Sequence, residues 1–183
     1  MFKALLVIQL KIIKMILNIK DKKYNNIVKN IIRNPYIKQM SDIKHHGISR
    51  LEHSLKVSYK SYQIAKKLNL DYTSVAIGGL IHDFYLEGNE RNYLKKFKDT
   101  FIHPRKVLNT AKNYFNLNEI EENIILSHMF PIYLHIPKYK ESILVNIVDK
   151  VIGAKELFNN CKHIVKYKVN YSYLIILFML GTK

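Results

Sequence analysis

The sequence predicts an all-α protein, in which amphipathic helices pack into one bundle. Apolar residues recur at three- to four-residue spacing, as in Leu51, Leu55, Tyr62 and Ala65, and this period places them on one face of a helix. No stretch shows the sustained alternation of apolar and polar residues that indicates a half-buried strand. With 183 residues, 48% of them hydrophobic, the chain is long enough for one domain with a packed core.

The chain divides into three predicted regions: residues 1–40, an apolar, amphipathic segment with a lead-in; residues 41–160, the helical domain; and residues 161–183, a short apolar tail. Lysines interrupt the apolar segment Phe2 to Ile19, which makes a membrane span costly. We expect this segment to pack on the domain or to contact a membrane surface peripherally, unless translation starts at Met15 and residues 1–14 are not native. The single cysteine, Cys161, excludes a disulfide framework and fits a cytoplasmic protein.

Local signals define the first two helices of the domain. The first helix is expected to end at a C-cap asparagine, Asn69, and Asp71 is the expected N-cap of the second. That second helix is predicted from about Tyr72 to Phe84. Because glycine is a poor helix former, the pair Gly78 and Gly79 predicts close contact with a neighbouring backbone.

Three more helices follow. Pro104 suits the first position of the third helix, and Asn118 with Glu121 resembles a capping box that opens the fourth. The fifth helix is predicted from about Glu141 to Phe158. Its inner face is expected to carry the apolar residues at helical spacing, which are Ile143, Ile147, Val151 and Ala154.

Six side chains on these helices are of the kinds that bind Zn²⁺, Fe, Mn²⁺ or Co²⁺. They are His53, His82, Asp83, His103, His128 and Asp149. Their neighbours along the chain are mostly apolar, and a carboxylate buried in such surroundings needs a partner such as a metal ion. Each residue alone is also compatible with a hydrogen-bonded core histidine, a helix cap or an ion pair. The prediction of a metal site therefore depends on the joint arrangement, because a helical bundle can direct such groups toward one interior point.

Residues 50–54 (Arg-Leu-Glu-His-Ser), 79–83 (Gly-Leu-Ile-His-Asp) and 149–150 (Asp-Lys) resemble the motifs of the HD superfamily of metal-dependent phosphohydrolases. The resemblance covers about Ser41 to Phe158. It implies an all-α HD-domain bundle and a divalent metal, with two ions per chain, of Fe, Mn, Co or Zn. One ion would take His53, His82, Asp83 and Asp149, and the second would take Asp83 as a bridge, with His103 and His128.

The resemblance further implies that a metal-activated hydroxide cleaves a phosphomonoester or phosphodiester. The expected substrate is a small phosphorylated molecule, most simply a nucleotide, but not cyclic di-GMP, because the motif of the HD-GYP subgroup is missing. Arg50, Arg105 and Lys150 are the candidates for binding substrate phosphate, since cationic side chains suit its oxygens. Asp83, Arg50 and Lys150 are the predicted catalytic residues. The alternative for the three basic residues is a solvated surface charge.

Two other functions remain open on the sequence. Some HD proteins with six ligands resemble di-iron oxygenases, and the ligand set does not separate the two chemistries. A binding module is the second alternative, because the net charge of +16 attracts nucleic acid and other polyanions. The lysines are spread along the chain, however, and the abundance of Lys, Asn, Ile and Tyr is expected from an AT-rich genome. An enzyme is favoured because all six ligand types are intact.

Overall fold

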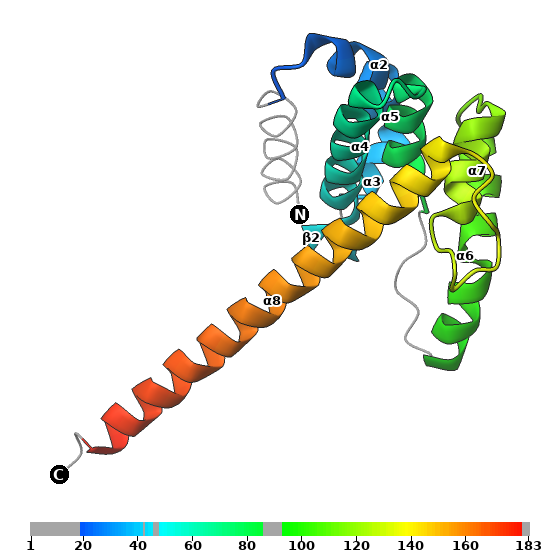
Figure 1. Ribbon diagram of the computed structural model, residues 1–183. Helices are drawn as coiled ribbons and strands as arrows, with labels where there is room; N and C mark the ends of the chain where they lie inside the picture. Colours follow the sequence, from blue (N-terminus) through cyan, green and yellow to red (C-terminus); the bar gives the residue numbers. More distant parts are fainter. Residues whose placement is uncertain (1–18, 42, 46–47, 86–92, 181–183) are drawn as a thin grey trace.

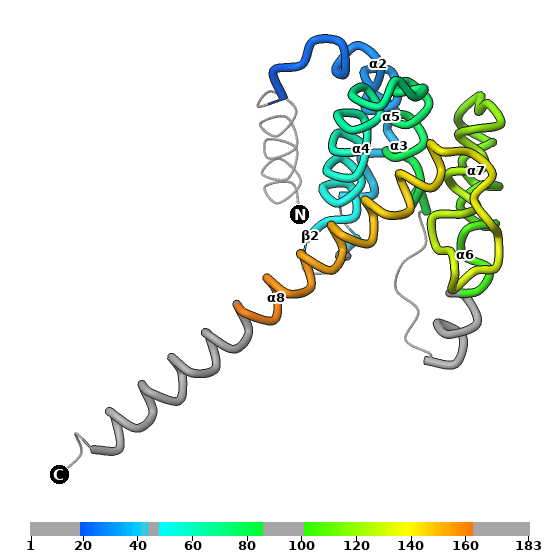
Figure 2. The backbone as a smooth tube through the Cα atoms, viewed as in Figure 1, coloured from blue at the N-terminus to red at the C-terminus, as the bar shows by residue number. Residues whose placement is uncertain are grey.

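The computed structural model describes residues 19–41, 43–45, 48–85 and 93–180 of the chain (Figures 1 and 2). These residues form mainly helices, which are α2 (Lys22–Arg33), α3 (Pro35–Gln39), α4 (Arg50–Lys67), α5 (Tyr72–Ile81), α6 (Tyr93–Lys112), α7 (Glu119–Ser127) and α8 (Lys140–Leu180). Two short strands, β1 (Lys44–His45) and β2 (Ile48–Ser49), pair antiparallel. The all-α prediction is confirmed. The apolar segment up to residue 18 lies outside the described residues, and the three-region division of the chain stays a prediction.

Helices α4 and α5 form the centre of the molecule (Figure 1). Helix α2 packs on α5, whereas α7 contacts α5, α6 and α8. Helix α8 crosses α4 obliquely and also reaches α5 and α7 (Figure 1). The bundle therefore brings α4, α5, α7 and α8 together at one place, although they are distant along the chain.

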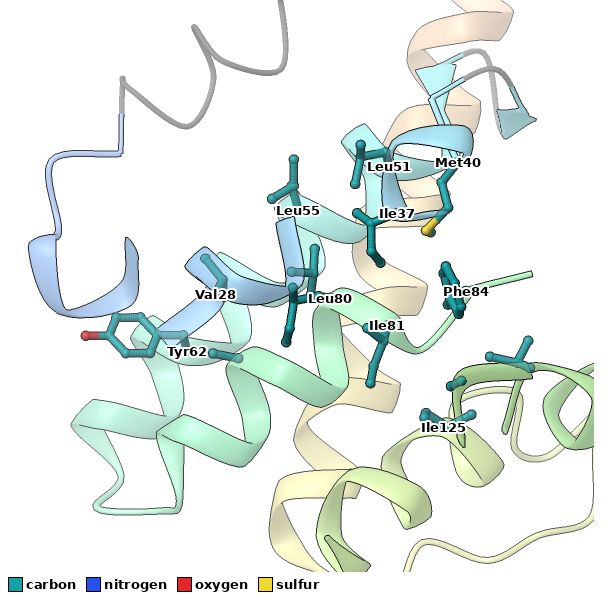
Figure 3. Packing of buried hydrophobic residues seen from close by; sticks show 14 of the residues in the cluster. Val28, Ile37, Met40, Leu51, Leu55, Tyr62, Leu80, Ile81, Phe84 and Ile125 are labelled. Atoms are coloured by element: carbon teal, nitrogen blue, oxygen red, sulfur yellow. The ribbon is translucent and has the colours of Figure 1, made fainter. Parts of the chain in front are cut away.

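The main apolar core lies between α2, α3, α4 and α5 and extends to α6 and α7 (Figure 3). Leu51 and Leu80 are fully buried within it, and burying one such side chain stabilises the fold by about 1.5–3 kcal/mol. A buried polar chain crosses the same region: the Tyr24 hydroxyl donates to Ser58 Oγ (2.8 Å), and Ser58 Oγ donates to the Ala76 carbonyl (2.6 Å). These contacts fix the mutual positions of α2, α4 and α5.

The predicted turn between α4 and α5 is present. Helix α4 has Leu68 as its C-cap, and Asn69 follows with a left-handed backbone (φ 54°). The Leu70 N–H donates to the Ala65 carbonyl (3.0 Å), as in the usual termination motif of helices. Asp71 is the N-cap of α5, as predicted. The helix ends at Ile81 rather than Phe84, because the chain turns at His82 and Asp83.

The close approach predicted from the glycine pair is found at Gly79. A Cβ atom at this position would lie 3.0 Å from the Ser58 Cα of α4, so no larger residue fits without a backbone shift. Gly78 instead faces a side chain, because its Cβ would lie 2.7 Å from Ile124 Cδ1 on α7. Both glycines therefore allow α5 to pack closely between its neighbours.

The predictions about the later helices hold only in part. The capping box of Asn118 and Glu121 is confirmed at the start of α7. Pro104 does not begin a helix but lies inside α6, which already starts at Tyr93. Helix α8 begins one residue before the predicted start, at Lys140, but continues far beyond Phe158, to Leu180. None of the described helices is both long and apolar enough to cross a bilayer.

The predicted inner face of the last helix is also wrong. Ile143, Ile147 and Val151 have exposed fractions of 46%, 54% and 62%, and Ala154 is exposed as well. The buried face of α8 is instead largely polar, and it comprises Ser142, Val145, Asn146, Val148 and Glu156. The helical period was predicted correctly, but the helix is rotated so that its polar side chains face α4 and α7.

Candidate metal centre

Three of the predicted ligands form a first group at the contact between α4, α5 and α8. His53, His82 and Asp149 each offer a ligand atom, and these atoms lie within 4.8 Å of one another. His53 Nε2 is 2.8 Å from Asp149 Oδ1, and His82 Nε2 is 3.5 Å from the same oxygen. Both imidazoles are buried. The group thus joins residues from three helices around one point.

The other three predicted ligands form a second group. Asp83, His103 and His128 also have ligand atoms within 4.8 Å of one another, and His103 Nε2 is 2.6 Å from Asp83 Oδ1. The two groups adjoin, because the ring centroids of His82 and His128 are 5.1 Å apart. Asp83, implied by the resemblance to be shared by both ions, is found in the second group only.

Helix ends orient two of the imidazoles. His82 is the C-cap of α5, and its Nδ1 donates to the Gly79 carbonyl (2.8 Å). His128 is the C-cap of α7, and its Nδ1 donates in the same way to the Ile125 carbonyl (2.6 Å). The last carbonyls of a helix have no partner within the helix, so they are available to these rings. In each ring the remaining nitrogen, Nε2, keeps its lone pair for a metal ion.

His53 has a different pair of partners. Its Nε2 faces Asp149, and its Nδ1 lies 2.8 Å from the carboxylate of Glu156. Glu156 is not among the site residues predicted from the sequence. A signal was present, because Glu156 follows Asp149 by seven residues, and two helical turns place both side chains on one face of α8.

The surroundings shift the pKa values of His53 and His128, which are both buried, in opposite directions. Burial by itself lowers the pKa of His53, but hydrogen bonds to Asp149 and Glu156 outweigh it and raise this pKa to about 9. For His128, burial and the neighbouring His82 lower the pKa to about 3. His128 is therefore a neutral imidazole at physiological pH, which is the form that binds metal.

The two aspartates are ionised in this environment. Burial by itself raises the pKa of Asp83, but the hydrogen bond from His103 and the charge of Arg50 hold it well below its usual value. The pKa of Asp149 is likewise low, because its bonds with His53 and His82 outweigh the effect of burial. Each group thus combines two imidazoles with one carboxylate anion, which is buried for Asp83 and 18% exposed for Asp149. This donor set fits a divalent transition metal.

The three basic candidates occupy different positions. Arg50 is largely buried, with a side-chain exposure of 11%, and its Nε lies 3.1 Å from Asp83 Oδ2. Its Nη1 donates to the Tyr85 carbonyl (2.5 Å). Lys150 Nζ donates to the His128 carbonyl (3.1 Å), whereas Arg105 is exposed. Arg50 and Lys150 thus contact the ligand groups directly, and the roles of all three residues in binding substrate stay predictions.

Comparison with known proteins gives one family and one solved structure. A family model described as HD domain matches residues 50–154. The crystal structure of the HD domain of the L. monocytogenes phosphodiesterase PgpH is similar over 76% of this chain and 86% of that chain, with 16% sequence identity and a TM-score of 0.49. A search of curated proteins found no match. The matched residues 50–154 include all six side chains of the two ligand groups.

Proposed function

The chain belongs to the HD domain family, and from this premise we propose that it is a metal-dependent phosphohydrolase that cleaves a phosphomonoester or phosphodiester. One observation carries the proposal: two adjoining groups of buried or largely buried side chains, each with two histidines and one aspartate. Carboxylates buried in this way need a compensating cation. A divalent metal ion meets this requirement and has a direct use in phosphate chemistry.

The finer proposal is two ions per chain, one for each ligand group. His53, His82 and Asp149 would hold the first ion, and Asp83, His103 and His128 would hold the second. Three protein ligands leave open positions on an ion for water and substrate, as in catalytic metal sites. The mixture of imidazole and carboxylate suits Fe, Mn, Co or Zn better than Mg²⁺ or Ca²⁺, which prefer oxygen ligands alone.

Metal ions bound here would lower the pKa of a water molecule and neutralise charge on phosphate oxygens. The protein side chains would fix the geometry. Hydrogen bonds from Nδ1 to backbone carbonyls hold the His82 and His128 rings in place. The Asp83 carboxylate is held by Arg50 at one oxygen and by His103 at the other. Asn146 Nδ2 donates to the carbonyls of Ser127 and His128 (both 2.8 Å), so α8 fixes the end of α7.

The proposed substrate is a small phosphorylated molecule, most simply a nucleotide. The cationic side chains of Arg50, Arg105 and Lys150 are the proposed contacts for its phosphate oxygens. Arg50 and Lys150 lie against the ligand groups, so they are near the position where a phosphate on the metal would be. Exposed Arg105, two residues after His103 on α6, would contact a more distant part of the substrate.

The decisive experiment is anaerobic purification with metal quantification, followed by a panel of phosphoesters and nucleotides on the same sample. We expect two ions per chain and hydrolysis of at least one phosphoester class. His103→Ala and His128→Ala should each lose one ion and most of the activity. A protein that saturates at one ion and stays fully active in both variants would contradict the two-ion proposal. Oxygen consumption without phosphoester hydrolysis would favour the di-iron oxygenase instead.

A further inference from the structure

Helix α8 directs two carboxylates at the two nitrogens of one imidazole. Asp149 Oδ1 lies 2.8 Å from His53 Nε2, and Glu156 Oε2 lies 2.8 Å from His53 Nδ1. A carboxylate only accepts hydrogen bonds, so each contact needs either a proton on the ring nitrogen or another cation. If Nδ1 keeps its proton for Glu156, a metal ion can take the place of the proton on Nε2, next to Asp149.

Glu156 is itself held in place on the side away from the ligand group. Its exposed fraction is 8%, and burial of an anion is costly unless it is paired. Lys56 Nζ supplies the pairing, at 3.1 Å from Glu156 Oε1, and also lies 3.0 Å from Glu52. Glu156 Oε1 thus forms an ion pair with Lys56, and Glu156 Oε2 forms the hydrogen bond with His53.

The Nδ1 atom of His53 has a different kind of hydrogen-bond acceptor from those of His82 and His128. His82 and His128 are C-caps, and each donates its Nδ1 proton to a carbonyl at the end of its own helix. His53 lies in the first turn of α4, where the backbone carbonyls accept hydrogen bonds from the following turn. Within α4 itself, His53 is therefore not next to a helix-end carbonyl, and its Nδ1 faces the Glu156 carboxylate instead.

We infer that Glu156 is a positioning residue, which holds His53 as the Nδ1–H tautomer so that Nε2 is directed at the metal ion. The inference rests on the proposed function, because it concerns a ligand of the same centre. Carboxylates that orient ligating histidines typically change metal affinity or activity by about 10- to 100-fold when they are removed. Lys56 would act through Glu156, by keeping that carboxylate ionised and in place.

The test uses the full chain and Zn²⁺, which gives no paramagnetic broadening in NMR spectra. Glu156→Met fills a similar volume but removes the acceptor, whereas Glu156→Gln keeps an oxygen acceptor without the charge. Glu52→Gln is the control, because it removes a carboxylate from the same lysine without a contact to His53. Two quantities are measured: Zn²⁺ affinity by competition with a chelator, and the ¹⁵N and ¹H resonances of the His53 ring in the Zn²⁺-loaded protein.

We expect Glu156→Met to weaken binding of one of the two Zn²⁺ ions about 10- to 100-fold and to abolish the hydrogen-bonded Nδ1–H resonance of His53. Glu156→Gln should keep that resonance with a smaller loss of affinity, and Glu52→Gln should match the wild type. Wild-type affinity and an unchanged His53 resonance in Glu156→Met would overturn the inference and leave the proposed function intact. A wild-type chain that binds none of Zn²⁺, Mn²⁺, Co²⁺ and Fe²⁺ would overturn both. Should Glu156→Met fail to fold, wild-type Zn²⁺ affinity together with unchanged His53 ring resonances in Glu156→Gln would overturn the inference instead.

Discussion

At the scale of single residues, the partners of a side chain determine its chemistry more than its residue type does. His53 and His128 are both buried histidines, yet the pKa of His53 is raised to about 9 and that of His128 is lowered to about 3. His53 faces two carboxylates, whereas His128 donates to a backbone carbonyl and adjoins two other imidazoles. The opposite shifts have opposite consequences for stability.

The metal-free protein is predicted to be most stable near pH 6.5. The raised pKa of His53 gives a stabilisation that is complete below the unfolded value of 6.5 and is lost as the pH rises to about 9. The lowered pKa of His128 costs nothing above 6.5, but destabilises the fold increasingly as the pH falls toward about 3. Urea unfolding of the chelator-treated chain across this range measures the effect. A free energy of unfolding that keeps rising from pH 6.5 to 9 would contradict the prediction.

Substitution of Arg50 is predicted to affect metal binding, whereas substitution of Arg105 is predicted to affect only substrate binding. Because Arg50 Nε is 3.1 Å from Asp83 Oδ2, Arg50→Ala should lower kcat/KM by about 10- to 100-fold and lower the affinity for one of the two metal ions. Exposed Arg105→Ala should raise KM and leave the metal content normal. Metal analysis and steady-state kinetics of both variants distinguish these roles. If Arg50→Ala has normal metal content and kinetics, the Arg50–Asp83 contact has no functional role.

At the scale of elements, close packing of α5 against α4 sets the distance between the first two ligand-bearing helices. Gly79 makes this approach possible, since a Cβ atom at this position would lie 3.0 Å from the Ser58 Cα. The two helices carry His53 and, at the turn after α5, His82 and Asp83. A small increase in the distance between α4 and α5 would therefore move the candidate ligands of the two groups relative to each other.

Gly79→Ala is accordingly expected to destabilise the protein by about 1–3 kcal/mol, as overpacking does in other cores. The added Cβ would lie 3.0 Å from Ser58 Cα, a backbone atom that cannot rotate away. Thr73→Ala is the control, because Thr73 is exposed on the same helix and alanine has the higher helix propensity. Chemical denaturation of both variants provides the comparison. Equal or greater stability of Gly79→Ala would show that the helices can separate without cost.

At the scale of the whole molecule, the ligand groups connect parts of the chain that are far apart in sequence. His53 and Asp149 are separated by 96 positions, yet they are in hydrogen-bond contact. The first group joins α4, α5 and α8, and the second joins the end of α5 with α6 and α7. Any ion bound at these positions would cross-link most of the helices of the domain.

Metal binding is therefore predicted to stabilise the entire fold. A ligand that binds only the folded state adds about 2.7 kcal/mol at a concentration of 100 times its Kd, which corresponds to a rise in Tm of roughly 5–10 °C for a chain of this size. Thermal unfolding of the chelator-treated chain with and without Zn²⁺ measures this rise. His53→Ala should show a reduced response. An unchanged Tm for the wild type at saturating Zn²⁺ would contradict the prediction.

The sequence by itself determined the features that depend on neighbouring residues. Periodicity predicted the all-α class, and local hydrogen bonding predicted the Asp71 cap and the Asn118–Glu121 capping box. The chemistry of the side chains, together with the resemblance to the HD superfamily, predicted six candidate ligands, which the structure brings together in two adjoining groups. Helix caps and family motifs are short-range patterns, so they can be predicted without the tertiary contacts.

Only the tertiary structure decided how the helices are turned and what each one contacts. The apolar residues of α8 predicted that Ile147 faces the core. Instead, Asp149 and Glu156 form hydrogen bonds with His53, so the polar face of α8 lies inward and Ile147 is exposed. Likewise, Pro104 continues a helix that it was expected to begin. Paired charges and hydrogen bonds between distant helices outweigh local apolar periodicity, because a buried polar group without a partner costs more than an exposed isoleucine.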